Sequence, residues 1–400
     1  MDSLPFLPDW PLSLDPLACF GITLFAAVVL GEVATRWLRL PRITGYVATG
    51  LLLSLLPQES WLAELRGGAH LIFELAFALL LFELGQRIDL GWLRRNPWLL
   101  ATSLGESLLA FIFVGALMLL FQLPPILALL VAALAASTGP AVILGVARDS
   151  GARGQVSDRL MLFSALGSCY SFVVLGISYA WLHQESASSW QTSVLHPLYL
   201  VGGSILLGAL AAVLVLHMLA RIRPGNNSQT LAAIALIAFT VAMAKSLDLS
   251  IVVALLFAGI LSRSLDRERR LQPMDFGLLS RVALIVVFVA TGTLLQPDSL
   301  GSALLPAIGL LAARALGKGI GIFAFSRPSG LSLRKASLLS IGMLPMSGAA
   351  LLWVERTANI WPELGAQLAA IVLTALIIME LLAPPALQFA LHRAGETRED

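Results

Sequence analysis

The chain carries little charge and almost no cysteine. Only 12% of its 400 residues are Asp, Glu, Lys or Arg, about half the share of a typical soluble domain. Its two cysteines, Cys19 and Cys169, are too few for a disulfide framework and lack metal-ligand spacing. No basic stretch precedes the first apolar run, so we expect no cleavable signal peptide. The 58% of apolar residues instead predicts a chain that mostly faces lipid or other apolar helices.

The sequence also lacks the groupings that enzymes and nucleic-acid-binding proteins need. No loop combines a nucleophile with a base and an acid, and no loop is Gly-rich in the manner of a phosphate site. The five histidines are scattered without metal-ligand spacing. Basic residues are spread over many loops instead of forming one patch. We therefore predict no enzyme activity, no cofactor, no bound metal and no nucleic-acid partner.

Apolar segments alternate with short polar loops along most of the chain. A helix needs about 20 apolar residues to cross a bilayer, and fewer where it is broken or buried in a bundle. On this basis we predict an all-α integral membrane protein with 13 transmembrane helices. The predicted spans are residues 17–36, 43–56, 69–86, 97–121, 124–147, 158–182, 195–220, 229–247, 250–263, 277–297, 301–325, 335–355 and 364–391.

Lys and Arg residues gather in every second loop, whereas the loops between carry only Arg66 and Arg356. Short loops rich in Lys and Arg stay in the cytoplasm. The alternation therefore predicts a plasma (inner) membrane protein with its N-terminus outside and its C-terminus in the cytoplasm. Residues 1–16 would form an extracytoplasmic segment and residues 392–400 a cytoplasmic tail. The basic loops and ends lie around residues 36–42, 87–95, 148–159, 221–223, 263–270, 327–335 and 393–398.

Two predicted spans contain Gly and Pro at their centres. One reads LAASTGPA from Leu134, and Gly139 and Pro140 would break it. The other reads LPMSGAA from Leu344, and Pro345 and Gly348 would break it. Backbone groups freed by such breaks survive in a membrane only inside protein or beside water. The breaks therefore predict a polar site near the bilayer midplane.

The two broken spans stand at matching places in the two halves of the chain. Paired interruptions of this kind are typical of transporters built from inverted repeats. We predict a transmembrane transporter domain over residues 17–391, with two six-helix repeats. These would be residues 17–182 and 229–391, joined by a linker helix at residues 195–220.

Several ionisable residues fall inside predicted spans, where a charge costs about 2.5–3.5 kcal/mol on insertion scales and so indicates function. Glu106 lies near the middle of the fourth span, and Glu380 lies deep in the last. Arg314 and Lys318 are four residues apart on the eleventh span, hence on one helix face. An ion pair with Glu106 or Glu380, direct substrate binding and snorkelling towards the interface are all open for these two cations.

The breaks supply further polar groups. Hydroxyls and freed carbonyls could bind a cation, and the half-helix that begins near Pro140 would point its N–H groups and positive dipole end at the cavity. Small polar residues of the sixth span, Ser168 among them, either line this site or only allow close helix packing. The predicted ion- or substrate-binding residues are Ser137, Thr138, Gly139, Ser168, Glu106, Arg314, Lys318 and Ser347.

Five short motifs occur in an order and spacing that resemble those of the Kef-type cation:proton antiporters. They are LPRITGY at residues 40–46, LFELG at 81–85 with IDL at 88–90, FAGIL at 257–261, ARALGK at 313–318 and GMLPMSG at 342–348. Each motif is weak by itself, but together they cover nearly the whole chain.

The resemblance implies a homodimer in which a transport domain moves past a scaffold domain, in an elevator-type alternating access. It also implies an ion site between two crossed broken helices. In this family an Asp on the helix after the first break binds either a proton or an alkali cation. The implied partners are thus a monovalent cation, the proton, the lipid bilayer and a second copy of the chain.

The chain departs from this pattern in the sixth span, which has no Asp or Glu between Arg159 and Gln184. In the second break Met346 stands where many members of the family have a basic residue. Three hypotheses follow. The first is an Na+ or K+/proton antiporter whose carboxylate has moved, with Glu106 as the best candidate. The second is a carrier of an anion or small neutral solute, and the third is a sensor or subunit that does not transport.

Overall fold

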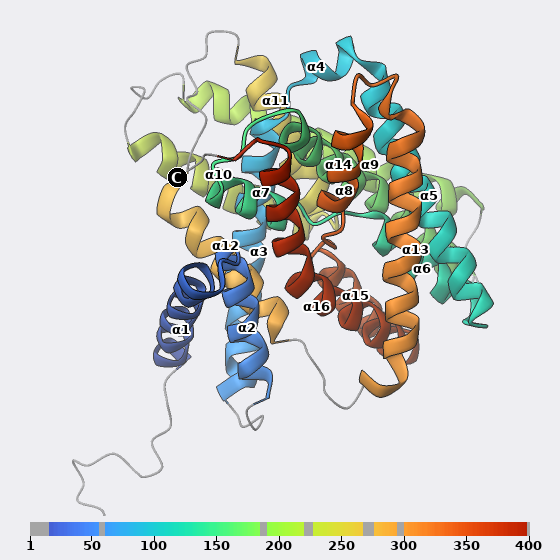
Figure 1. Ribbon diagram of the computed structural model, residues 1–400, viewed down its shortest axis with the longest axis horizontal. Coiled ribbons are helices and arrows are strands. Elements are labelled where there is room, and N and C mark those ends of the chain that lie inside the picture. Colours follow the sequence, from blue (N-terminus) through green and yellow to red (C-terminus); the bar gives the residue numbers. More distant parts are fainter. Residues whose placement is uncertain are drawn as a thin grey trace, which may run out of the picture.

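The structure, a computed structural model, describes residues 16–55, 61–184, 190–219, 227–266, 276–293 and 300–397. Every regular element in these ranges is a helix (Figure 1), so the all-α prediction is confirmed. The helices are α1 (Pro16–Leu38), α2 (Arg42–Ser54), α3 (Trp61–Arg87), α4 (Leu90–Arg95), α5 (Pro97–Leu120), α6 (Pro125–Ala136), α7 (Pro140–Asp149), α8 (Gln155–Gln184), α9 (Trp190–Leu219), α10 (Asn227–Ser246), α11 (Ile251–Leu265), α12 (Gly277–Gly292), α13 (Leu300–Ser326), α14 (Leu333–Gly342), α15 (Ala350–Ile360) and α16 (Pro362–Arg393).

Proline and serine mark where several helices begin. Pro97, Pro140 and Pro362 are the first residues of α5, α7 and α16. Proline suits this position because the first N–H of a helix has no partner within the helix and the proline φ is already helical. At α11 and α14 the Ser250 and Ser332 side chains accept hydrogen bonds from backbone N–H groups in the first turn, as N-cap residues do.

The helices follow the predicted spans with a few differences. The fifth and twelfth predicted spans are each two short helices, α6 with α7 and α14 with α15. The third begins earlier than expected, at Trp61, and the short α4 lies in a loop where no helix was predicted. The tenth ends at Gly292, and the residues at 294–299 lie outside the described ranges, as does most of the predicted N-terminal segment.

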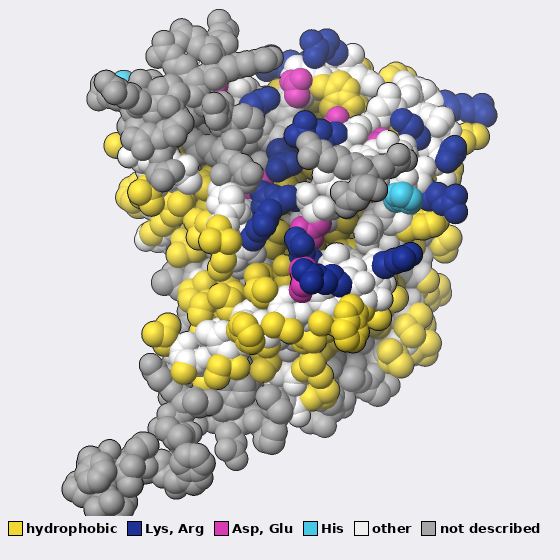
Figure 2. Space-filling model, turned by 60° about the vertical axis from the view of Figure 1, so that its left-hand side comes forward, with side chains coloured by type: hydrophobic (Ala, Val, Ile, Leu, Met, Phe, Trp, Pro, Cys, Tyr) yellow, Lys and Arg dark blue, Asp and Glu magenta, His cyan; other side chains and the backbone are white. Residues whose placement is uncertain are grey.

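By length and composition, eight helical segments of the described ranges can cross a membrane, with α6 and α7 together counted as one, and α11 and α12 are shorter apolar helices. Figure 2 shows hydrophobic side chains over the lower and middle part of one face, and Lys and Arg side chains gathered above them. Broad apolar surface next to a basic end fits a chain held in a bilayer. The number of 13 spans and the division into repeats stay predictions.

The contacts divide most helices into two groups, which we call the first and the second helix group. In the first, α3 packs extensively on α11 and α2 on α12, with α1, α9 and α10 beside them. In the second, α5 packs along α13, and α6, α7, α8, α14, α15 and α16 complete the group. In Figure 1, α1, α2 and α12 lie together at the left and α5 and α13 at the right.

Two pairs of glycines let helices of the first group approach closely. A Cβ on Gly259 of α11 would lie 2.3 Å from the Phe82 carbonyl oxygen and 2.9 Å from the Cα of Gly85 in α3. A Cβ on Gly292 of α12 would likewise lie 2.9 Å from the Cα of Gly50 in α2. Small residues at these crossings bring the backbones together, which is how helices gain packing energy in lipid.

We expect Gly259→Ala to lower the melting temperature of the purified protein in detergent. The added methyl group meets backbone atoms that cannot rotate away, and overpacking of this kind costs about 1–3 kcal/mol. Gly202→Ala is the matched control, because it is also inside a helix and a Cβ there meets no atom within 4 Å. An equal melting temperature for both variants would contradict the close α3–α11 contact.

Candidate functional site

The two helix breaks touch each other. The helix ends at Ala136 and restarts at Pro140 in the first break, and ends at Gly342 and restarts at Ala350 in the second. The backbone N–H of Gly139 donates to the carbonyl of Pro345 at 3.1 Å. A Cβ on Gly139 would lie 2.3 Å from the Met346 carbonyl oxygen, so only glycine permits this approach. The carbonyls freed by both breaks therefore converge on one place.

Arg314 of α13 fills that place. Its side chain is only 1% exposed, and its guanidinium donates to carbonyls of both breaks. On the first break Nε contacts the oxygen of Ala135 at 2.8 Å and Nη2 that of Ser137 at 3.0 Å. On the second, Nη2 contacts the oxygen of Pro345 at 2.8 Å, and Nη1 that of Leu344. Nη2 also lies 3.4 Å from the Thr138 hydroxyl. The planar fork of five donors suits Arg to this role.

Lys318 lies one turn farther along α13 and pairs with Glu106 of α5. The Lys318 ammonium donates to Glu106 Oε2, and also to the Ala136 carbonyl at 2.9 Å. Both side chains are almost fully buried. The Ser107 hydroxyl donates to the other carboxylate oxygen of Glu106 at 2.8 Å. A buried pair of this kind is costly to desolvate, and it survives only when further hydrogen bonds satisfy its atoms.

Close packing of α5 on α13 brings this pair together. A Cβ on Gly317 would lie 2.6 Å from the Cα of Ala110, and one on Gly321 would lie 2.4 Å from the Cα of Glu106. The two glycines are four residues apart and flank Lys318 on the sequence. This is the small-xxx-small arrangement that lets membrane helices meet at their backbones.

A small cavity lies on another side of the crossing and is lined by serine side chains. Its volume is about 10 Å³, and Ser137, Ser168, Ser171 and Ser347 are among its lining residues. Space of that size holds about one water molecule. Each hydroxyl already contacts a backbone atom. Ser168, for example, donates to the Ser164 carbonyl at 2.8 Å, which leaves its oxygen able to accept or to coordinate.

The structure thus divides the residues that we predicted as a site. Ser137, Ser168 and Ser347 line the serine cavity, whereas Arg314, Lys318 and Glu106 form a charged cluster against the first break. Thr138 and Gly139 belong to the crossing itself. Glu380 is buried but is not among the partners of Arg314 or Lys318, and one of its carboxyl oxygens has no hydrogen-bond partner among the described residues.

Two features of the site were not predicted. Ser171 was weighed with Ser168 as a packing or a site residue and left out of the predicted site, yet it lines the serine cavity and donates to the Ala133 carbonyl at 2.6 Å; its spacing of three from Ser168 was the available signal. The proximity of Glu106 to α8 was also missed. A Cβ on Gly167 would lie 3.8 Å from Glu106 Oε1, so the carboxylate of α5 reaches the part of α8 that has no Asp or Glu, between Arg159 and Gln184.

Comparison with known proteins gives one family and one fold. A family model described as "Sodium/hydrogen exchanger, transmembrane" matches residues 22–392. The structure of the sodium proton antiporter MjNhaP1 from Methanocaldococcus jannaschii at pH 8 is 17% identical, with 95% of this chain and 96% of that chain covered and a TM-score of 0.69. An electron-microscopy map of the same antiporter matches with 19% identity, 97% and 100% coverage and a TM-score of 0.71. The overall fold is therefore that of an antiporter.

We expect Arg314→Lys to destabilise the protein despite keeping the charge. An ammonium has three donors on one atom and cannot reach the carbonyls of both breaks, and each buried acceptor left unpaired costs roughly 1–3 kcal/mol. Thermal unfolding in detergent measures the effect, with the exposed Arg94→Lys as the control. A melting temperature equal to that of the control would show that the guanidinium does not hold the crossing together.

Proposed function

Because this chain belongs to the sodium/hydrogen exchanger family, we propose that it exchanges a monovalent cation, Na+ or K+, for protons by secondary active transport. The family is one of transporters and not of enzymes. The observation that carries the proposal is the buried Glu106–Lys318 pair beside the first break. It places a carboxylate that can hold a cation next to an ammonium that can release a proton, which is what competition between a proton and a cation requires.

The proposed exchange is balanced in charge. In one state Lys318 is protonated and pairs with the Glu106 carboxylate. A cation that enters takes the place of the ammonium beside Glu106 and the Ala136 carbonyl. Lys318 then releases its proton to water and becomes neutral. The site holds the same net charge before and after, so one proton leaves for each cation that binds, and the buried site avoids an extra charge.

We propose that Glu106 serves in place of the carboxylate that α8 lacks between Arg159 and Gln184. Its carboxylate lies against Gly167, next to Ser168, which lines the serine cavity. We propose that Ser137, Thr138, Gly139, Ser168 and Ser347 supply oxygen atoms along the path of the cation. Arg314 has a positioning role, because its donors already hold carbonyls of both breaks.

We also propose that the second helix group moves as an elevator past the first. The Glu83 carboxylate of α3 pairs with Arg148 of α7 in the second group, and accepts from the Ser280 hydroxyl of α12 in its own group at 2.8 Å. A polar contact between the groups can break and re-form during a movement, whereas contacts within each group would stay. The chain would act as a homodimer, as the resemblance implies.

The glycine pairs support the proposed inverted repeats. In the 13-span scheme α2 and α3 correspond to α11 and α12. A two-fold axis would then exchange two contacts. One is the contact of α2 with α12 through Gly50 and Gly292, and the other is that of α3 with α11 through Gly85 and Gly259. The crossing of the fifth and twelfth spans lies on the same axis. The proposed topology keeps the N-terminus outside and the C-terminus in the cytoplasm of the plasma membrane.

An anionic substrate has less support. Both basic side chains near the crossing already contact protein oxygen atoms: Arg314 contacts carbonyls and Lys318 contacts Glu106 and a carbonyl. An anion would have to displace these contacts and then face Glu106. A neutral solute, or a sensor without transport, is supported by no described contact.

We expect Glu106→Gln to abolish proton movement driven by Na+ or K+ in proteoliposomes. The amide keeps the shape but has no negative charge to balance a cation. Glu32→Gln is the control, because that carboxylate pairs with Arg36 on the surface of α1. The double variant Glu106→Gln with Lys318→Met removes both buried charges and therefore leaves no unpaired lysine. If flux is lost in the double variant as well, an unpaired lysine is not the cause of the loss. Normal flux in either variant would refute the role of the pair.

Cross-linking between the groups tests the elevator. In protein without native cysteines, Glu83→Cys with Arg148→Cys would be joined by a short bifunctional methanethiosulfonate, which forms a disulfide with each thiol. We expect flux to stop until a reductant cleaves these disulfides. Glu83→Cys with Ser280→Cys is the matched control, because both positions lie in the first helix group. Unchanged flux after complete cross-linking of Glu83→Cys to Arg148→Cys would contradict a movement between the groups.

A further inference from the structure

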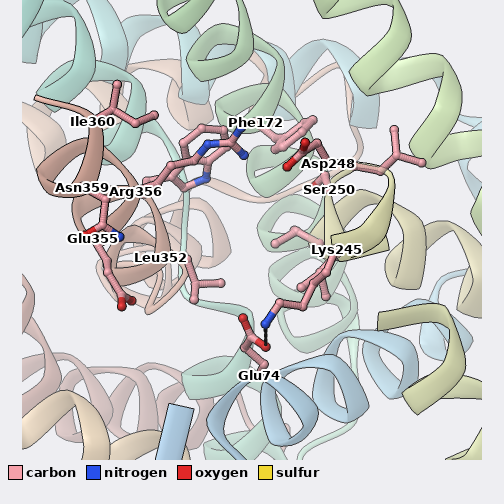
Figure 3. Close-up of a pocket in the computed structure, with 14 residues that line it drawn as sticks. Glu74, Phe172, Lys245, Asp248, Ser250, Leu352, Glu355, Arg356, Asn359 and Ile360 are labelled. Carbon is pink, nitrogen blue, oxygen red and sulfur yellow. Dashed lines mark hydrogen bonds and ion pairs between the residues drawn. The ribbon is translucent and has the colours of Figure 1, made fainter. Parts of the chain in front are cut away.

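A second, larger cavity lies between the two helix groups. We call it the vestibule; its volume is about 390 Å³. Figure 3 shows Glu355, Arg356 and Asn359 of α15 on one side, and Lys245 of α10 and Asp248 on the other. Polar side chains on both walls suit a water-filled space through which ions pass.

An ion pair between α3 and α10, both of the first helix group, lies at the bottom of this space as Figure 3 shows it. Lys245 Nζ lies 2.7 Å from a carboxylate oxygen of Glu74 on α3 (Figure 3). The Glu74 side chain is 5% exposed and that of Lys245 is 48% exposed. Charged groups of both signs therefore face the vestibule, and it does not select an anion or a cation by charge alone.

The vestibule reaches the serine cavity through three shared residues. Phe172 of α8, Val252 of α11 and Trp353 of α15 line both spaces. Phe172 and Trp353 belong to the second helix group, and Val252 belongs to the first. All three are apolar, so the boundary that the two spaces share among the described residues is hydrophobic, whereas each space also has polar side chains in its walls. Hydrophobic constrictions control passage by excluding water.

Trp353 is held in place by aromatic and cationic neighbours. Its ring centroid lies 5.5 Å from that of Phe172 and 5.2 Å from that of Tyr179, within the usual range for aromatic pairs. The Arg356 guanidinium lies 5.9 Å from the Trp353 ring on the vestibule side, in the geometry of a cation–π contact. The Tyr179 hydroxyl also donates to the Trp353 carbonyl at 3.2 Å.

We infer that Phe172 and Trp353 form a gate between the vestibule and the serine cavity, which a monovalent cation must pass to reach the crossing. The inference rests on the proposed function for the identity of the ion. The serine cavity has room for about one water molecule, so an ion enters it without most of its hydration shell. Val252 of the first helix group lines the same boundary as the two rings of the second group. Relative movement of the groups would therefore shift the two rings together against Val252 and change the opening between them.

Accessibility of a cysteine behind the gate tests this inference. The background carries Cys19→Ala and Cys169→Ala, and Ser168→Cys places a thiol in the serine cavity. The probe is Ag+, a small monovalent cation that binds thiolate. After timed exposure in lipid nanodiscs the protein is unfolded, free thiols are alkylated, and intact mass counts the thiols that Ag+ has blocked.

We expect Trp353→Ala to accelerate the blocking of Ser168→Cys by about tenfold or more, the effect of lowering a barrier by about 1.4 kcal/mol. The control thiol is Ser164→Cys, one turn away on α8, fully buried and outside both cavities; its rate should not change. If Trp353→Ala does not fold, Phe172→Ala removes the other ring of the gate and gives the same test.

Two results would overturn the gate. One is an unchanged Ser168→Cys rate in a folded variant, and the other is an equal acceleration at both thiols, which would mean general loosening. The measurement requires no transport. A gated cavity in a protein without cation/proton exchange would therefore refute the proposed function and leave the gate intact.

Discussion

The structure depends on how the carbonyls freed by two broken helices are satisfied inside a membrane protein. Hydrocarbon offers no donor, and each unsatisfied polar group costs several kcal/mol. Arg314 supplies the donors, because its guanidinium reaches carbonyls of both breaks at once. It needs α13 to lie directly against the crossing, and the glycines of α13 that pack on α5 place it there. The packing of α13 on α5 therefore also places the side chain that satisfies the crossing.

The placement of α13 against the crossing gives it a charged side and a side lined by hydroxyls. Arg314 and the Glu106–Lys318 pair occupy the first, and the serine cavity occupies the second. Arg314 acts as a permanent cation that cannot lose its proton, whereas lysine and glutamate can exchange theirs. The permanent charge suits a structural role and the titratable pair suits exchange. Glu106 of α5 thereby places a carboxylate near α8, which has no Asp or Glu between Arg159 and Gln184.

The two helix groups meet through surfaces of different kinds. Within each group, glycines allow backbone contact between helices, which resists sliding because packed interfaces have few alternative arrangements. Between the groups lie a shared apolar core of side chains, the vestibule, its aromatic boundary and the Glu83–Arg148 pair. Solvated space and single polar contacts are easier to rearrange than interlocked backbones. The distribution of these contacts is what makes a rigid-body movement of one group past the other physically reasonable.

Local patterns in the sequence were enough to determine most of the helices and both breaks, but not the short α4 or the early start of α3. Apolar length, Pro at helix starts and Gly/Pro interruptions act over a few residues, so α6 with α7 and α14 with α15 could be foreseen. The pairing of Lys318 with Glu106 instead of Glu380 could not be foreseen, because it depends on which helix α13 packs against. The hold of Arg314 on carbonyls, the approach of Glu106 to Gly167, and the meeting of Phe172 with Trp353 were likewise decided by tertiary structure. Contacts between residues far apart in the chain arise only when backbone packing sets the distances, and no local pattern encodes those distances.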